Sequence, residues 1–129
     1  MPDIDKYLSA IQKNEGSDLH ISTGSPPILR VNGTMAPLKA TPLESEKVQS
    51  LLDPIMTDTA RQNFAETGDA DWAYDLKGIA RFRCNAFQDR RGPGAVFRII
   101  PNDFMTAEDL NLPEAVLNLC TLPKGLVLV

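Results

Sequence analysis

Arginine is concentrated in one short segment of the chain, RFRCNAFQDRRGPGAVFR at positions 81–98. The segment holds five arginines, no lysine and one acidic residue, so its formal charge is about +4, whereas the whole chain has a net charge of −4. A guanidinium group presents a rigid, planar set of donors that matches phosphate and other multidentate anions. We therefore expect this segment to bind an anion such as phosphate, in preference to a role in which its arginines only cover apolar surface.

The other reactive residue types give little support for catalysis. The single histidine, His20, has no nucleophile motif or metal ligands at matching spacing, and we interpret it as a hydrogen-bonded structural residue beside Asp18. Cys84 and Cys120 form no CxxC pair and are expected to be reduced core residues. The chain has no GxxxxGK[ST] sequence and hence no P-loop. We expect no catalytic residue, no metal site and no hydrolysis by this chain alone.

Composition sets the class of protein. A chain of 129 residues that is 43% hydrophobic can bury one core and is short for two complete domains, so we expect one domain with a piece of another. The sequence pI near 4.9 argues against a chain that coats nucleic acid. No apolar run is long enough to span a membrane and no signal segment opens the chain, which makes a cytosolic protein the default.

The first third of the chain predicts a helix followed by short strands. Apolar residues at positions 4, 8 and 11 have helical spacing, and Gly16 follows as a helix end. The runs LHIS and ILRV then predict strands. Asn32-Gly33 is a strong hairpin signal, because both central residues of the favoured tight turn need a positive φ.

Two further helices are expected before the arginine segment. Thr41-Pro42-Leu43-Glu44 has the pattern of a capping box, with proline at the first helical position, and predicts a helix start. A second amphipathic stretch, residues 57–66, is followed by Gly68, which predicts the helix end.

The arginine segment belongs to a predicted meander of three antiparallel strands. DADWAYDL, residues 69–76, alternates acidic with apolar residues and predicts a half-buried strand whose aspartates, Asp69, Asp71 and Asp75, form a solvated face instead of a metal site. IARFRCNAF and AVFRII predict the next two strands, joined by a loop QDRRGPG. The arginines then project from one side of the sheet or from that loop.

After Pro101 the sequence predicts a connector, a short helix and a last strand. Pro113 precedes the helix, which extends through Val116, Leu117 and Cys120. The final run GLVLV, residues 125–129, is typical of a strand buried on both faces of a parallel sheet. Such a strand has no parallel sheet to join in this chain, which suggests a cut inside a larger protein.

Three segments carry a resemblance to a known family. SDLHISTGSPPILRVNG (17–33), ARFRCNAFQDRRGPGAVFR (80–98) and LPKGLVLV (122–129) resemble, in order and spacing, the N-terminal part of the PilT family of type IV pilus retraction ATPases, within the type II and type IV secretion ATPases. In that family the sequence after LPKGLVLV continues into the Walker A loop. The resemblance therefore implies that Walker A and Walker B lie outside this chain.

The resemblance implies an α+β fold with a particular division of the chain. Residues 1–101 would form a PAS-like antiparallel sheet with helices packed on one face. Residues 102–112 would be an interdomain linker, and residues 113–129 the first helix and strand of a RecA-like ATPase domain.

The resemblance also implies a role for the arginines. Members of the family are hexameric rings that bind ATP and magnesium on the RecA-like domain, and arginines of the N-terminal domain close over the phosphates. By position in the motif, Arg83 and Arg98 match these phosphate-contacting residues. Arg81 and Arg91 are weaker candidates, with subunit contacts as their alternative role. The chain itself is expected to hold no cofactor.

The implied partners are the RecA-like domains of the same and neighbouring subunits in a homohexamer and the inner-membrane platform protein of the pilus. The implied location is the cytoplasm, peripheral to the bacterial inner membrane at the pilus base. Neither nucleic acid nor a membrane span is expected.

Three alternatives stay open at the level of sequence. The chain could be the equivalent domain of a pilus assembly or type II secretion ATPase. It could be a self-contained PAS-like module that binds a small ligand or a protein, which predicts an enclosed apolar pocket. RNA binding through the basic hairpin ranks lower, because Ile79 and Arg81 stand where an RNA-recognition strand needs aromatic residues.

Overall fold

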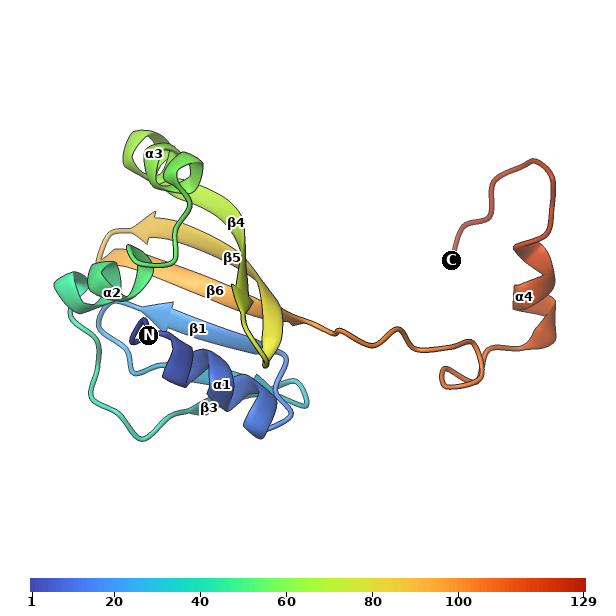
Figure 1. Cartoon of the computed structure of the whole chain (residues 1–129), viewed down its shortest axis with the longest axis horizontal. Helices are drawn as coiled ribbons and strands as arrows, with labels where there is room; N and C mark the ends of the chain where they lie inside the picture. The colour runs from blue at the N-terminus through green and yellow to red at the C-terminus, as the bar shows by residue number, and fades with distance from the viewer.

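The computed structural model describes residues 1–129, with six strands in one antiparallel sheet and four helices (Figure 1). The strands are β1 (Asp18–Ser22), β2 (Ile28–Val31), β3 (Thr34–Pro37), β4 (Asp69–Leu76), β5 (Ala80–Asp89) and β6 (Gly92–Ile100). The helices are α1 (Asp5–Lys13), α2 (Ser45–Leu52), α3 (Asp58–Thr67) and α4 (Glu114–Leu119). The order across the sheet is β3-β2-β1-β6-β5-β4. The expected α+β class is confirmed.

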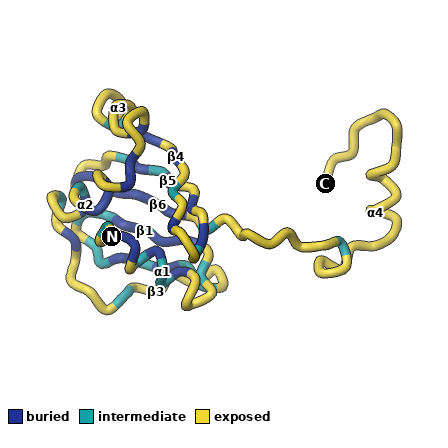
Figure 2. The backbone as a smooth tube through the Cα atoms, viewed as in Figure 1, coloured by how far each residue is buried: buried dark blue, intermediate teal, exposed yellow.

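The hydrophobic core lies between one face of the sheet and the N-terminal helices, and every core residue falls between Ile4 and Phe97 (Figure 2). The largest fully buried side chains include Phe82 from β5, Phe97 from β6, and Leu8 and Ile11 from α1. Burying such side chains removes apolar surface from water, at about 25 cal/mol per Å². We call residues 1–100, which contain this core, the body.

The opposite face of the sheet carries no helix, and we call it the open face. Alternate residues of a strand point to opposite faces, so the charged positions of β4 and β5 project here while their apolar neighbours enter the core. Asp69, Asp71 and Asp75 are exposed, as the alternation predicts. Cys84 faces the core, where burial raises its pKa to about 12 and leaves an unreactive thiol.

The turn between β2 and β3 matches the hairpin signal. Asn32 and Gly33 are its central residues, with φ values of 49° and 78°. Both lie in the left-handed region that the favoured two-residue turn requires, and asparagine and glycine enter this region at the lowest cost.

The meander β4-β5-β6 is confirmed, but its second connection is shorter than expected. Gln88 and Asp89 pair with Pro93 and Gly92, which leaves a turn of two arginines in place of the loop QDRRGPG. The Asp89 carboxylate accepts the backbone N–H groups of Arg91 at 2.7 Å and of Gly92 at 3.1 Å. This local bond closes the turn tightly and extends both strands.

The capping box expected at Thr41-Pro42-Leu43-Glu44 is not formed. Helix α2 begins at Ser45, with Glu44 as its N-cap and no side-chain cap hydrogen bond. Leu43 is 6% exposed and hydrogen-bonds to the turn before β2. Its carbonyl oxygen accepts the Gly24 N–H at 2.7 Å, and its own N–H donates to the Ser25 carbonyl oxygen at 3.0 Å. These bonds hold residue 43 in an extended conformation, so the helix starts later.

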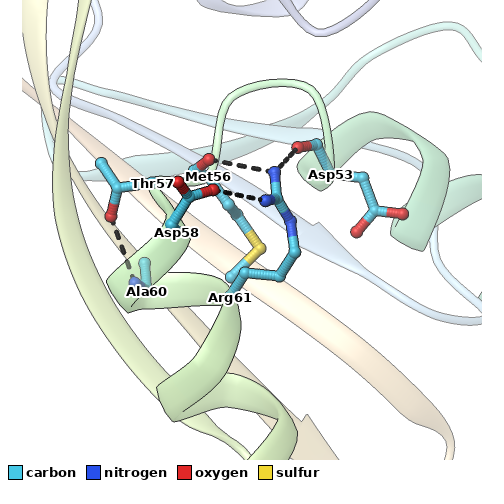
Figure 3. Close-up of polar contacts among 6 residues, drawn as sticks. All are labelled: Asp53, Met56, Thr57, Asp58, Ala60 and Arg61. Carbon is cyan, nitrogen blue, oxygen red and sulfur yellow. Dashed lines mark hydrogen bonds and ion pairs between the residues drawn. The ribbon is translucent and has the colours of Figure 1, made fainter.

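Helix α3 begins and ends as predicted. The Thr57 hydroxyl accepts the backbone N–H of Ala60 at 3.1 Å, and Gly68 ends the helix with a φ of 73°. Arg61 joins α3 to the end of α2: it donates to the Asp58 carboxylate at 3.0 Å and to the carbonyl oxygens of Asp53 and Met56 at 2.9 and 3.2 Å (Figure 3).

Residues 101–129, which we call the extension, run away from the sheet, and none of them is buried (Figures 1 and 2). The helix expected after Pro113 is present as α4. Two expectations are wrong. Residues 125–129 form no strand, because no neighbouring strand supplies hydrogen bonds, and Cys120 is exposed because α4 covers no core. No helix in the structure is long and apolar enough to cross a membrane.

Candidate functional site

Four residues of the open face lie side by side on neighbouring strands, and we call them the arginine row. In order across β2, β1, β6 and β5 they are Arg30, Asp18, Arg98 and Arg83. Directly opposite residues of antiparallel strands share a face, with Cβ atoms about 5 Å apart. The register therefore brings together the two leading candidates, Arg83 and Arg98, and adds a third arginine and an aspartate.

Asp18 is the buried centre of this row. Its side chain is 4% exposed, whereas that of Arg98 is 67% exposed. The carboxylate accepts the Arg98 Nε–H at 2.9 Å on Oδ1 and the Ser17 hydroxyl at 2.6 Å on Oδ2. Burial acts to raise the pKa of Asp18, but the hydrogen bonds from Ser17 and Arg98 and the nearby guanidinium charges outweigh it and lower the pKa. Asp18 is therefore anionic at neutral pH.

The Arg83 side chain is exposed and makes no hydrogen bond or ion pair within the chain. It lines a shallow hollow of about 240 Å³ on the open face together with Arg98, Asp71, Asn85 and Val96. Two guanidinium groups and one carboxylate give the hollow a net charge of +1. An anion with several oxygens can accept from both arginines at once, which is the geometry that favours phosphate.

The two weaker candidates lie apart from this hollow. Arg81 shares the open face with Arg83 but stands one row further along β5, opposite Asp75 on β4 and Ile100 on β6. Arg91 lies in the turn between β5 and β6, beside Gly24 and about 20 Å along the strands from Arg83. Arg91 therefore cannot contact an anion in the same hollow. Contact of any of these arginines with phosphate stays a prediction.

Sequence reasoning missed Arg30 and the role of Asp18. The Arg30 Nε is buried without a hydrogen-bond partner, and this side chain lies next to Asp18 on the side away from Arg98. The alternation in ILRV indicates that Arg30 faces away from Leu29, which is buried. The place of Arg30 in the arginine row depends on the pairing of β2 with β1, which the spacing of residues in the sequence does not indicate.

His20 lies on the open face between Ile28 and Val96. The expectation that it is hydrogen-bonded is wrong for Nε2, which is buried without a partner. Burial lowers the pKa of His20, because the opposing effect of Asp18 is smaller and two neighbouring arginines also disfavour the charged form. His20 is neutral at pH 7 and supplies no positive charge to the row.

No group of three or more histidine, cysteine, aspartate or glutamate side chains in the structure could hold a metal ion. The side chains at the hollow fit the oxygens of a phosphate, but the chain supplies no loop of backbone N–H groups to hold a whole nucleotide. The hollow is therefore suited to an anion with several oxygens, such as a phosphate group.

Comparison with curated proteins gives relatives that match nearly the whole chain. The type IV pilus retraction ATPase PilT of Pseudomonas aeruginosa is 42% identical over 127 residues, which are 98% of this chain and 37% of the relative. The type IV pilus ATPase PilU of the same organism is 36% identical over 126 residues, or 98% of this chain and 33% of the relative. The chain thus spans about a third of these relatives. No family model matches it.

Two solved structures share the fold. A crystal structure of the pilus retraction motor PilT with bound ADP superposes with a TM-score of 0.78 and 32% identity, over 93% of this chain and 35% of that one. The ATPase DotB of Legionella pneumophila superposes with a TM-score of 0.74 over 95% of this chain and 35% of that one, but at 22% identity it supports the fold alone. By sequence and by fold, the chain belongs to the PilT-like secretion ATPases, as a counterpart of their N-terminal domain.

Proposed function

We propose that the chain is the N-terminal regulatory and oligomerisation domain of a hexameric type IV pilus retraction ATPase, the motor of twitching motility. In this role Arg83 and Arg98 contact the phosphates of an ATP that is held, with magnesium, by a RecA-like domain. The observation that carries the proposal is the direct pairing of Arg83 with Arg98 on the open face, at a hollow with net positive charge. The match to a pilus retraction ATPase over 98% of the chain supports it.

Contact with the γ-phosphate would couple ATP turnover to movement. Two guanidinium groups favour the state in which a triphosphate bridges the two domains, and they lose contacts once hydrolysis releases phosphate. The N-terminal domain can then move relative to the ATPase domain. The binding energy of the arginines would in this way control a rotation between domains.

The extension supports the proposed division at residues 102–112 and 113–129. Its α4 helix exposes apolar side chains, with Val116 and Leu117 each about 40% exposed. Such a surface is typical of an element that packs against a further part of a domain. We propose that residues 113–129 begin the RecA-like domain and that residues 102–112 link it to the body.

The partners follow from the same proposal. The open face would meet the RecA-like domain of its own or a neighbouring subunit, and the assembled ring would act on the inner-membrane platform protein from the cytoplasm.

A self-contained ligand-binding module fits less well, because the hollow beside the arginines is lined by charged and polar side chains, with Val96 as its one hydrophobic residue.

The experiment is to replace Arg83 or Arg98 by alanine in the full-length ATPase that carries this chain. We expect the kcat for ATP to fall about 10²-fold in either variant, since each change removes a charged donor to the transferring phosphate. Arg90→Ala, an exposed arginine in the β5–β6 turn, is the matched control and should keep normal turnover. Normal turnover in both Arg83→Ala and Arg98→Ala would contradict the proposal.

A further inference from the structure

We propose that Asp18 is the positioning residue for Arg98: its buried carboxylate holds the Arg98 Nε, so that the two terminal nitrogens of the guanidinium are presented to the anion hollow beside Arg83. The inference rests on the proposed function and adds a residue to that site. Asp18 itself does not contact the anion, because its side chain is 4% exposed and it does not line the hollow.

The contact at Nε fixes the plane of the guanidinium group. Asp18 Oδ1 lies 2.9 Å from Arg98 Nε, and no hydrogen bond within the chain uses Nη1 or Nη2 of Arg98. A free arginine side chain loses rotamer entropy when it binds, and this loss is a cost to binding. Because Asp18 has already ordered Arg98, less of that cost remains when an anion arrives.

The carboxylate is well placed for this task because it is itself fixed. The Ser17 hydroxyl donates to Oδ2 at 2.6 Å, on the side of the carboxylate that Arg98 does not use. Strand pairing places Asp18 directly opposite both Arg98 and Arg30, in the middle of the sheet. Neither strand position can shift without breaking the ladder of backbone hydrogen bonds, so the anchor is rigid.

The arginine row keeps a positive charge that can attract an anion, because its one carboxylate does not neutralise all of its guanidinium groups. Three arginines and one aspartate leave the row at +2, and Asp18 is the only carboxylate in it. If the Asp18–Arg98 pair served stability alone, its contribution would be limited, because the Arg98 side chain is 67% exposed and water screens its charge. Burying the aspartate is therefore better explained by a role in orienting the arginine.

The first test is a double-mutant cycle in the full-length ATPase, with Asp18→Asn, Arg98→Ala and the combined variant. We expect Asp18→Asn to lower kcat/KM for ATP about tenfold, a loss typical of one hydrogen bond to a charged group. In the Arg98→Ala background the same change should alter kcat/KM by less than twofold, because the residue that Asp18 positions is already absent. An equal loss in both backgrounds would overturn the inference.

The matched control is Asp58→Asn. Asp58 also accepts from an arginine, Arg61, at 3.0 Å, at the start of α3 (Figure 3), and neither residue lines the hollow. We expect normal kcat/KM in this variant. A tenfold loss there would show that removal of any arginine–carboxylate pair lowers turnover and would overturn a specific role for Asp18.

The second test needs no ATPase activity and separates failure of the inference from failure of the proposed function. Nitrogen-15 NMR of the 129-residue chain should show an Arg98 Nε–H signal protected from exchange with solvent, lost in Asp18→Asn and kept in Asp58→Asn. Thermal unfolding of each variant checks that it is folded. An unchanged Arg98 signal in folded Asp18→Asn would overturn the inference, whatever the ATPase assay gives.

Discussion

The body and the extension each contain a short amphipathic helix, but only the body gives its helix a surface to cover. In α1, Leu8 and Ile11 are fully buried against the sheet. In α4, Val116, Leu117 and Leu119 have similar spacing and remain about 40% exposed. Apolar periodicity therefore predicts the helix, whereas burial of the helix depends on what the rest of the chain places beside it.

The same contrast holds for extended segments. The core positions of β5 and β6 lie in strands that each have two hydrogen-bonded neighbours, on the sheet face that the helices cover. The run GLVLV is more apolar than either strand, yet residues 125–129 are exposed and without secondary structure. Backbone hydrogen bonds between strands require a second strand, so apolar composition alone does not create one.

The largest expected effect comes from a phenylalanine in each region. Phe82→Ala removes a fully buried ring from the body and should lower the free energy of unfolding by about 3–5 kcal/mol. Phe104→Ala, in the extension, removes a ring that is 97% exposed and should change it by less than about 0.5 kcal/mol. Urea denaturation of the chain measures both. Similar losses in the two variants would contradict the division into body and extension.

A glycine in each region gives a smaller contrast. A Cβ added at Gly94 would lie 2.6 Å from the ring of Phe87 and 3.0 Å from the carbonyl oxygen of Ile21. We expect Gly94→Ala to destabilise the body by about 1–3 kcal/mol, because the ring must shift. Gly125→Ala meets no atom within 4 Å, and although the φ of 118° disfavours alanine, residue 125 lies outside the core, so the urea midpoint should stay unchanged. A stable Gly94→Ala protein would show that Phe87 moves aside freely.

A buried histidine makes the stability of the body depend on pH. Burial lowers the pKa of His20 in the folded chain, so below about pH 6.5 the unfolded chain binds the proton more readily. The free energy of unfolding should therefore fall as the pH is lowered from 6.5 to 5. His20→Gln, which cannot titrate, should remove this fall. Urea denaturation at several pH values tests it, and an identical slope in the variant would assign the effect to other groups.

The smallest effect is expected from removal of the extension. Deletion of residues 102–129 should change the free energy of unfolding by less than about 0.5 kcal/mol, because every core residue lies between Ile4 and Phe97. The truncated chain should also expose less apolar surface and bind less of a dye specific for such surface. A loss above about 1 kcal/mol on deletion would mean that the extension packs on the body in solution.

Much of the body could be predicted from local sequence. The hairpin at Asn32-Gly33 and both ends of α3 follow from residue types that favour one backbone conformation within a few positions. The capping box at Thr41 failed because Leu43 is held by bonds to a turn some twenty residues earlier. Local signals therefore predict an element well until a tertiary contact competes for the same backbone.

The candidate site could be predicted only in part. Composition and spacing singled out Arg83 and Arg98, and the resemblance gave them a role. The sequence offered no means to see that Arg98 meets Asp18, which lies 80 residues away, or that Arg30 joins the same row. Nor could spacing separate Arg83 from Arg91, which belong to one segment but lie at different ends of the sheet.

Local sequence was enough to predict most helices and strands of the body, which of their residues are charged or apolar, and which family the chain resembles. The pairing of β1 with β2 and β6 follows from the tertiary structure, and it places one carboxylate between guanidinium groups from separate parts of the chain. The two kinds of effect act over different distances along the chain. Dihedral preferences and side-chain periodicity act over a few residues, whereas strand order and burial depend on contacts between segments far apart in the chain.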